Sequence, residues 1–186
     1  MKTTLRISLL AMPLILLAFT ARAQDHGMQC PMEKCQKCQM HGQHDGESHD
    51  EMVQKNGDEA MGFPHDKTTH HFRIQAGGGA IEVTANDPAD TANITAIRTH
   101  LSHIAMMFRE GDFTTPMHVH DFIPPGTTTM RLVKDKIQYE YEEIAGGGRV
   151  RIASKDEIAV AAIHDFLRFQ ITEHHTGDSL AALENR

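Results

Sequence analysis

Donor groups for soft and borderline metal ions are frequent in this sequence. Its 186 residues include 14 His, 11 Met and 3 Cys. Imidazole, thioether and thiolate groups are the protein donors that bind copper, and imidazole and thiolate also bind zinc. Because frequency alone does not make a site, the spacing of these residues must indicate whether they can meet at one ion.

The densest group of donors lies near the N-terminus. Three cysteines follow the spacing C-x₄-C-x₂-C with methionines around them, and the candidate ligands are Met28, Cys30, Met32, Cys35, Cys38 and Met40. This spacing is not the paired C-x₂-C framework of structural zinc sites. Capture of Cu(I) by thiolates and thioethers is one interpretation. A Cys35–Cys38 disulfide in an otherwise featureless segment is the other.

A second group of donors follows helical spacing. His100, His103 and Met107 are separated by three and four residues, which places them along one face of a helix. His118 and His120 follow in a segment that we expect to be extended, which would point both imidazoles to the same side. The candidate ligands of this part of the chain are His70, His71, His100, His103, Met107, Met117, His118 and His120. Ordinary hydrogen-bonded surface histidines are the alternative.

Three further histidines are interpreted differently. His174 and His175 follow the second helical pattern, so we expect them to interact with the C-terminal end of that helix dipole rather than with a metal. His164 lies within the same helical pattern and is expected to be structural.

Residues 1–23 have the pattern of a secretory signal peptide. Two basic residues precede an apolar run over residues 9–19, and Ala21-Arg22-Ala23 forms a small-x-small cleavage site. The run is too short to cross a bilayer as a helix. We therefore expect cleavage after Ala23, export to the periplasm, and no membrane attachment of the mature chain.

After this leader, composition divides the chain into a tail and a body. Residues 24–66 contain few large apolar side chains other than Met and are expected to be disordered. Residues 67–178 alternate between strand and helix patterns, which predicts one folded domain. Residues 179–186 are expected to form a short C-terminal tail.

The body contains two similar halves, about residues 70–112 and 137–178. Each half has a strand, an Ala-Gly-Gly-Gly turn, a second strand, a helix and a Gly-Asp pair. Two such ββα units predict an α+β fold, with a four-stranded antiparallel sheet and two helices on one face. Chance similarity of the halves is the alternative to an internal repeat.

Charge and missing motifs argue against several functions. The chain has 18 Lys and Arg against 25 Asp and Glu, and only 5% aromatic residues, which argues against nucleic-acid binding. The H-E-x-x-H, G-x-S-x-G, P-loop and dinucleotide-binding motifs are absent. An exported enzyme that holds Zn or Cu with His100 and His103 is one alternative function, and a binding module without metal is another.

Four runs in the body resemble a family of small exported bacterial proteins with no assigned activity. These runs are KTTHHF (67–72), IRTHLSHIAMMF (97–108), GDF (111–113) and HDFLRFQI (164–171). The resemblance covers about residues 61–178 and implies a shared fold. Some members carry the label aspartate carbamoyltransferase, but the S-T-R-T and H-P-x-Q motifs of that enzyme are absent here. The N-terminal donor group resembles those of periplasmic copper-handling proteins in composition.

Export, soft donors and a helical donor stripe together predict a periplasmic copper-binding protein used in copper tolerance or trafficking. Methionine, cysteine and histidine would bind the ion as Cu(I), with zinc as the alternative metal. The expected partners are the metal ion itself and another periplasmic copper protein.

Overall fold

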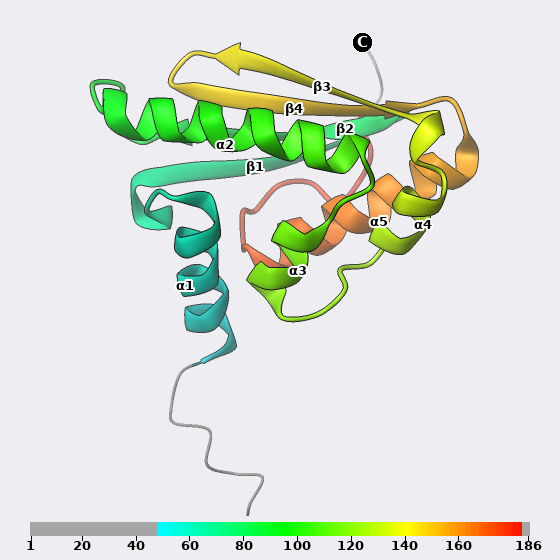
Figure 1. Cartoon of the computed structure of the whole chain (residues 1–186), viewed down its shortest axis with the longest axis horizontal. Helices are drawn as coiled ribbons and strands as arrows, with labels where there is room; N and C mark the ends of the chain where they lie inside the picture. Colours follow the sequence, from blue (N-terminus) through cyan, green and yellow to red (C-terminus); the bar gives the residue numbers. More distant parts are fainter. Residues whose placement is uncertain (1–47, 184–186) are drawn as a thin grey trace, which may run out of the picture. The chain divides into compact units, whose positions relative to one another are not determined.

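The computed structural model describes residues 48–183, so the predicted signal peptide and the N-terminal donor group of cysteines and methionines lie outside the described residues. Strands and helices alternate along the described chain (Figure 1). They are α1 (His49–Met61), β1 (Thr68–Gln75), β2 (Gly78–Ala85), α2 (Thr91–Arg109), α3 (Thr114–His120), α4 (Thr127–Leu132), β3 (Ile137–Ile144), β4 (Gly147–Ser154) and α5 (Glu157–Glu173), with 3₁₀ turns at His65–Lys67 and Lys134–Lys136.

The strands form one antiparallel sheet in the order β1-β2-β4-β3. Each hairpin turns at an Ala-Gly pair, and Gly146 has a φ of 74°, in the left-handed region that favours glycine. The pairing of β2 with β4 joins the two hairpins and places Ile81 opposite Val150. Because side chains alternate along a strand, this register gathers the apolar side chains on one face of the sheet.

Both long helices, α2 and α5, cover that apolar face (Figure 1). Leu167 of α5 lies so close to Gly79 of β2 that a Cβ there would overlap it. Leu101 of α2 has its Cδ1 3.2 Å from the position of a Cβ on Gly148 of β4. Val83 is paired with Gly148 and lies four residues from Gly79, so the two glycines face the same way. The core therefore lies between one face of the sheet and two helices.

The opposite face of the sheet carries charged side chains that pair across the strands. Arg149 Nε lies 2.7 Å from Glu82 Oε1, and Arg149 Nη1 lies 3.1 Å from Glu142 Oε1. At the edge strand β1, Arg73 Nη1 lies 2.9 Å from Asp178 Oδ1 of the C-terminal segment. The polar face is thus occupied by ion pairs, and the histidine cluster described below lies on the apolar side.

The predicted α+β fold is confirmed by this sheet and the helices that cover it. The order strand, strand, helix occurs twice, as β1-β2-α2 and β3-β4-α5. A common origin of the two halves stays a prediction. Over residues 48–183, no helix combines the length and the apolar character needed to cross a membrane.

Helix α1 corrects the prediction that all of residues 24–66 lack structure. Ser48 and Glu51 form a reciprocal capping box at its start, in which each side chain accepts from the backbone N–H of the other residue. Val53 is 3% exposed where α1 packs on α3, and Phe63, just after the helix, is also 3% exposed in the core. Composition missed this helix because two buried side chains and a cap are enough to anchor it.

Helix α3 corrects the expectation that Met117 to His120 are extended. The Asp112 side chain accepts from the backbone N–H of Thr114, which satisfies a free donor of the first turn, and Pro116 lies within that turn, where proline is tolerated. In a helix, His118 and His120 are 200° apart rather than on the same side. His118 is therefore exposed, while His120 is only 1% exposed.

Two glycine-to-alanine substitutions should have opposite effects on stability. We expect Gly79→Ala to lower the free energy of unfolding by about 1–3 kcal/mol, because the new Cβ overlaps Leu167 and the Arg73 carbonyl. Gly57→Ala in α1 should raise it by up to about 1 kcal/mol, because Ala favours the helix and the nearest atom is Met61 Cε at 3.6 Å. Urea denaturation measures the free energy of unfolding of both variants. Equal, small changes in the two variants would contradict the close packing of Gly79 against Leu167 and Arg73.

Candidate functional site

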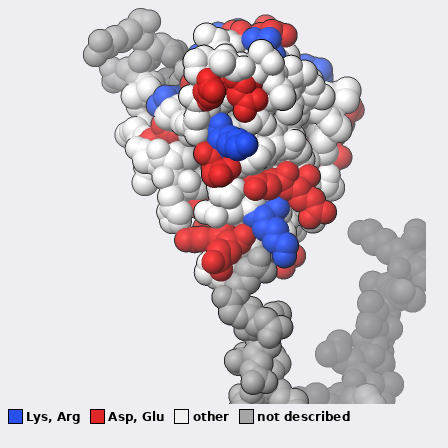
Figure 2. Space-filling model, turned by 90° about the vertical axis from the view of Figure 1, so that its left-hand side faces the viewer, with Lys and Arg blue, Asp and Glu red and all other residues white. Residues whose placement is uncertain are grey.

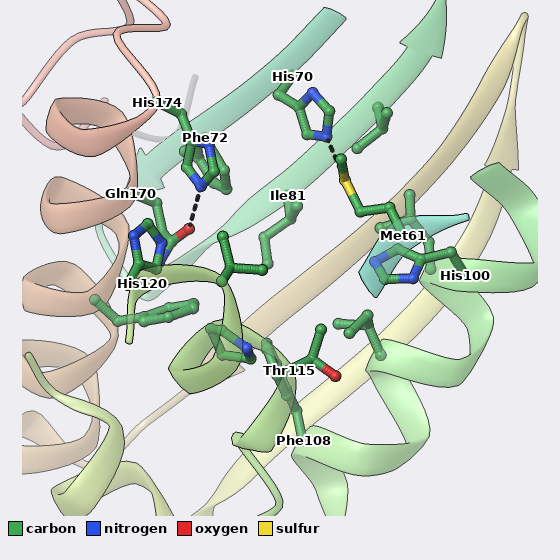
Figure 3. A pocket seen from close by; sticks show the side chains of 16 residues that line it. Met61, His70, Phe72, Ile81, His100, Phe108, Thr115, His120, Gln170 and His174 are labelled. Carbon is green, nitrogen blue, oxygen red and sulfur yellow. Dashed lines mark hydrogen bonds between the residues drawn. The ribbon is translucent and has the colours of Figure 1, made fainter. Parts of the chain in front are cut away.

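Four imidazoles and one thioether line a single cavity between the sheet and the helices (Figure 3). His70 comes from β1, His100 from α2, His120 from α3, His174 from the end of α5, and Met61 from the end of α1. We call this space the inner cavity; its volume is about 80 Å³. The rest of its lining is mainly apolar: Phe72, Ile81, Val83, Leu101, Ile104, Phe108, Thr115, Pro116, Val119, Phe166 and Gln170.

The alternation of β1 decides which of its two adjacent histidines reaches the cavity. His70 pairs with Val83 on the apolar face. His71 faces the other way, and its Nδ1 donates to Asp178 Oδ1 at 3.0 Å. The structure therefore brings one of these two candidate ligands into the cavity and leaves the other on the charged face.

The helical stripe on α2 does not converge at one point. His100 lines the inner cavity, whereas His103 is exposed. Met107 lies two turns, about 10 Å, further along the same face, where its Sδ accepts from Thr115 Oγ1 at 3.7 Å. Of the three predicted ligands on α2, only His100 lines the cavity. Because α2 runs straight along the sheet, His103 and Met107 lie further along its axis, away from the cavity.

Met61 and His70 are the closest pair of donors in the cavity. The Nε2 of His70 lies 3.3 Å from the Sδ of Met61, and the two side chains point toward one another (Figure 3). Phe63 packs against the His70 ring with a centroid distance of 6.3 Å and against the His100 ring at 5.7 Å. An apolar ring thus holds two imidazoles beside the thioether.

A second group of rings surrounds His174. Its imidazole stacks on Phe72 at a centroid distance of 5.7 Å, lies nearly parallel to His70 at 6.2 Å, and meets His120 edge-on at 5.1 Å. Gln170 contacts both His174 and His120. The side chains from β1, α3 and α5 are therefore held by ring contacts and by one amide.

Burial keeps these imidazoles uncharged at neutral pH. Loss of solvation is the largest cause in each case, and it lowers the pKa of His70 to about 4, that of His100 to about 4 and that of His174 to about 3. Repulsion between neighbouring imidazoles acts in the same direction. The pKa of His120 is also lowered by burial. Each ring therefore keeps a lone pair on one nitrogen, the form in which imidazole binds metals.

A polar groove lies on the other side of the same ligands. This outer groove, of about 270 Å³, shares Met61, His70 and His174 with the inner cavity and is also lined by Asp50 and Glu173. The surface beside α1 carries more acidic than basic side chains (Figure 2). Any cation approaching the shared ligands from this side would therefore pass carboxylates.

Two histidine–carboxylate contacts lie beside the outer groove at the N-terminal end of α1. His49 Nε2 lies 2.8 Å from Glu173 Oε2, and His175 Nε2 lies 3.6 Å from Asp50 Oδ2. Asn56 Nδ2 also donates to the Val119 carbonyl at 3.4 Å. These contacts attach α1, and with it Met61, to α3 and to the end of α5.

The predicted ligands of the body separate into two groups. His70, His100 and His120 meet at the inner cavity, while His71, His103, Met107, Met117 and His118 do not line it. Met61 and His174 line the cavity and were missed. Met61 lies in the segment expected to be disordered, and His174 was assigned to the helix dipole. The distance of each from the other donors in the sequence left no spacing signal that could have found them.

No three His, Cys, Asp or Glu side chains within residues 48–183 are arranged so that they could hold one metal ion. A site in this part of the chain must therefore use fewer of these groups or include the thioether. Comparison with protein-family models, curated proteins and solved structures found no match for the chain.

The half-buried, poorly solvated imidazoles should make the free energy of unfolding depend on pH. An unfolded imidazole takes up a proton near pH 6.5, whereas folded His100 does so only near pH 4. The unfolded state thus binds more protons between these values, and the free energy of unfolding falls as the pH drops through that window. We expect His100→Leu to reduce this fall by about 2 kcal/mol between pH 7.5 and 4.5.

Urea denaturation across that pH range measures the effect. His103→Ala is the matched control, because His103 lies three residues away on the same helix but is exposed. It should leave the pH dependence of the wild type unchanged. If the free energy of unfolding of His100→Leu and of the wild type changes equally with pH, His100 is not held in its neutral form.

Proposed function

We propose that the protein binds copper as Cu(I) in the periplasm, in the service of copper tolerance or trafficking. In the body of the protein, Met61 and His70 are the central ligands. The observation that carries this proposal is the 3.3 Å separation between His70 Nε2 and Met61 Sδ in a cavity where the imidazole is desolvated and neutral. A thioether only accepts, so His70 Nε2 donates to Met61 Sδ in the metal-free protein. The two donors can share one ion without rearrangement of the backbone once the proton of His70 has moved to Nδ1.

The donor set favours Cu(I) over zinc. Imidazole nitrogen and thioether sulfur are soft or borderline neutral donors, which suit Cu(I). Zinc in a structural site takes four ligands, mostly thiolates and imidazoles. The lack of a three-residue His, Cys, Asp or Glu cluster in the described residues disfavours zinc. Cu(I) is satisfied by the Met61–His70 pair with one further imidazole, and both His174 and His100 line the same space.

The apolar lining also favours a singly charged ion. Burial of charge in a medium of low dielectric constant becomes costlier as the charge increases, so Cu(I) is held at lower cost than a divalent ion. The imidazoles are already neutral at pH 7, so binding of the ion releases no net proton from them. The cavity therefore presents uncharged ligands.

The N-terminal donor group supports the same function from sequence alone. Cys30, Cys35 and Cys38 would capture Cu(I) together with Met28, Met32 and Met40, and the leader would direct the chain to the periplasm. These residues lie outside the described part of the chain. Their role is a separate claim from the site in the body and needs its own variants.

The alternative functions gain less support. The residues that line the inner cavity include no carboxylate that could serve as a base for a metal-bound water. A volume of about 80 Å³ also falls well below that of sites for drug-sized organic ligands. The cavity has the size and chemistry for an ion.

Anaerobic competition with a chromogenic Cu(I) chelator tests the body site. The full chain carries Ser at positions 30, 35 and 38 and Leu at positions 28, 32 and 40, so that the thiolates and thioethers of the N-terminal donor group do not mask the weaker site. We expect one Cu(I) per chain in this background. Met61→Leu removes the sulfur at nearly constant volume and should weaken binding at least about tenfold, equivalent to about 1.4 kcal/mol. His70→Leu should weaken it further, because the imidazole is the stronger donor.

Two exposed histidines supply the controls. His103→Ala and His118→Ala remove imidazoles that do not line the cavity, so Cu(I) affinity should not change. Urea denaturation of each variant shows that the body is folded. Equal affinities for the wild-type body, Met61→Leu and His70→Leu would exclude the proposed site. Cu(I) binding by the chain that retains Cys30, Cys35 and Cys38 would then restrict the function to the N-terminal donor group.

A further inference from the structure

Gln170 lies between two imidazoles of the inner cavity and contacts both. It is 5% exposed and is part of α5. Its Oε1 lies 3.1 Å from His174 Nε2, and its Nε2 lies 3.4 Å from His120 Nε2 (Figure 3). An amide oxygen only accepts a hydrogen bond and an amide nitrogen only donates one. One imidazole must therefore donate to Gln170, and the other must accept from it.

The amide determines which nitrogen of each ring carries the proton. His174 Nε2 must hold a proton to donate to Gln170 Oε1, so the lone pair of this neutral ring is on Nδ1. His120 Nε2 must hold a lone pair to accept from Gln170 Nε2, so its proton is on Nδ1. The neutral imidazoles are therefore fixed in different tautomers.

Glu173 supports this orientation of the amide independently. His120 Nδ1 is buried without a hydrogen-bond partner in the described chain, and Glu173 Oε2 lies 3.9 Å from it. A carboxylate at this distance attracts an N–H group and repels a lone pair. The reversed amide would place the lone pair of His120 toward Glu173, so electrostatics selects the orientation observed.

We propose that Gln170 is a positioning residue that makes His174 the third Cu(I) ligand, through Nδ1, and withholds His120 from the metal. His120 has only one lone pair in this tautomer, and the amide of Gln170 occupies it. The part of this inference that concerns the metal rests on the proposed function. The assignment of tautomers does not, because it concerns the protein without metal. Residues that orient metal-binding histidines in this way commonly change affinity by 10–100-fold.

NMR correlation of the imidazole nitrogens in the ¹⁵N-labelled full chain tests the assignment at pH 7.5 without metal. We expect His174 as the Nε2–H tautomer and His120 as the Nδ1–H tautomer. The opposite pair in the wild type would overturn the proposal, whatever any variant does. His164, which also lies in α5, is an internal reference. Its Nε2 donates to the Gln75 carbonyl of β1 at 2.8 Å, and this hydrogen bond does not involve Gln170.

Gln170→Met keeps the length of the side chain but removes the amide. We expect His174 to populate both tautomers in this variant, while His164 stays Nε2–H and reports that α5 is still in place. Cu(I) affinity in the cysteine-free background should fall about tenfold. An unchanged His174 tautomer in a folded Gln170→Met variant would show that Gln170 does not position it.

Addition of one equivalent of Cu(I) to the ¹⁵N-labelled chain in the cysteine-free background separates this inference from the proposed function. We expect the His174 Nδ1 resonance to shift while Nε2 keeps its proton and the His120 nitrogens stay unchanged. A shift of the His120 nitrogens, or loss of the proton from His174 Nε2, would overturn the role assigned to Gln170. If Cu(I) shifts none of the cavity imidazoles, the proposed function fails, and the metal-free tautomers still decide whether Gln170 positions His174.

Discussion

Removal of imidazoles from water is the constraint on which the rest of this site depends. Three rings, those of His70, His100 and His174, have pKa values two units or more below the ordinary value because the fold places them among apolar side chains. A charged ring in this cavity would be costly, so the native fold keeps them neutral. The same desolvation leaves one lone pair available on each ring.

Different elements of the fold supply the side chains that line the cavity. The sheet supplies a flat apolar face, and its alternation points His70 inward. Helices α2 and α5 bring His100 and His174 from the two ββα units, and α1 adds Met61 from outside them. Helix α1 is attached through buried Val53 and a few polar contacts, so the position of the thioether depends on them.

The sheet and the two long helices could be predicted because their signals are local. Apolar alternation and Gly-rich turns define both hairpins, and an apolar stripe with three- and four-residue steps defines α2. Helices α1 and α3 were mispredicted for the same reason. Each depends on contacts with distant parts of the chain, such as Asn56 with the carbonyl of Val119. Composition and spacing contain no information on such contacts.

The sequence by itself determined the donor types, the α+β fold and the part of α2 that carries His100. Only the tertiary structure decided which donors meet. It separated His103 from His100 although they are neighbours on one helix, and it joined Met61 and His70 with His174, more than a hundred residues later in the chain. The physical reason is that a shared cavity is made by packing between elements. Spacing along one helix places side chains relative to that helix alone, and the burial that makes an imidazole neutral comes from the elements packed against it.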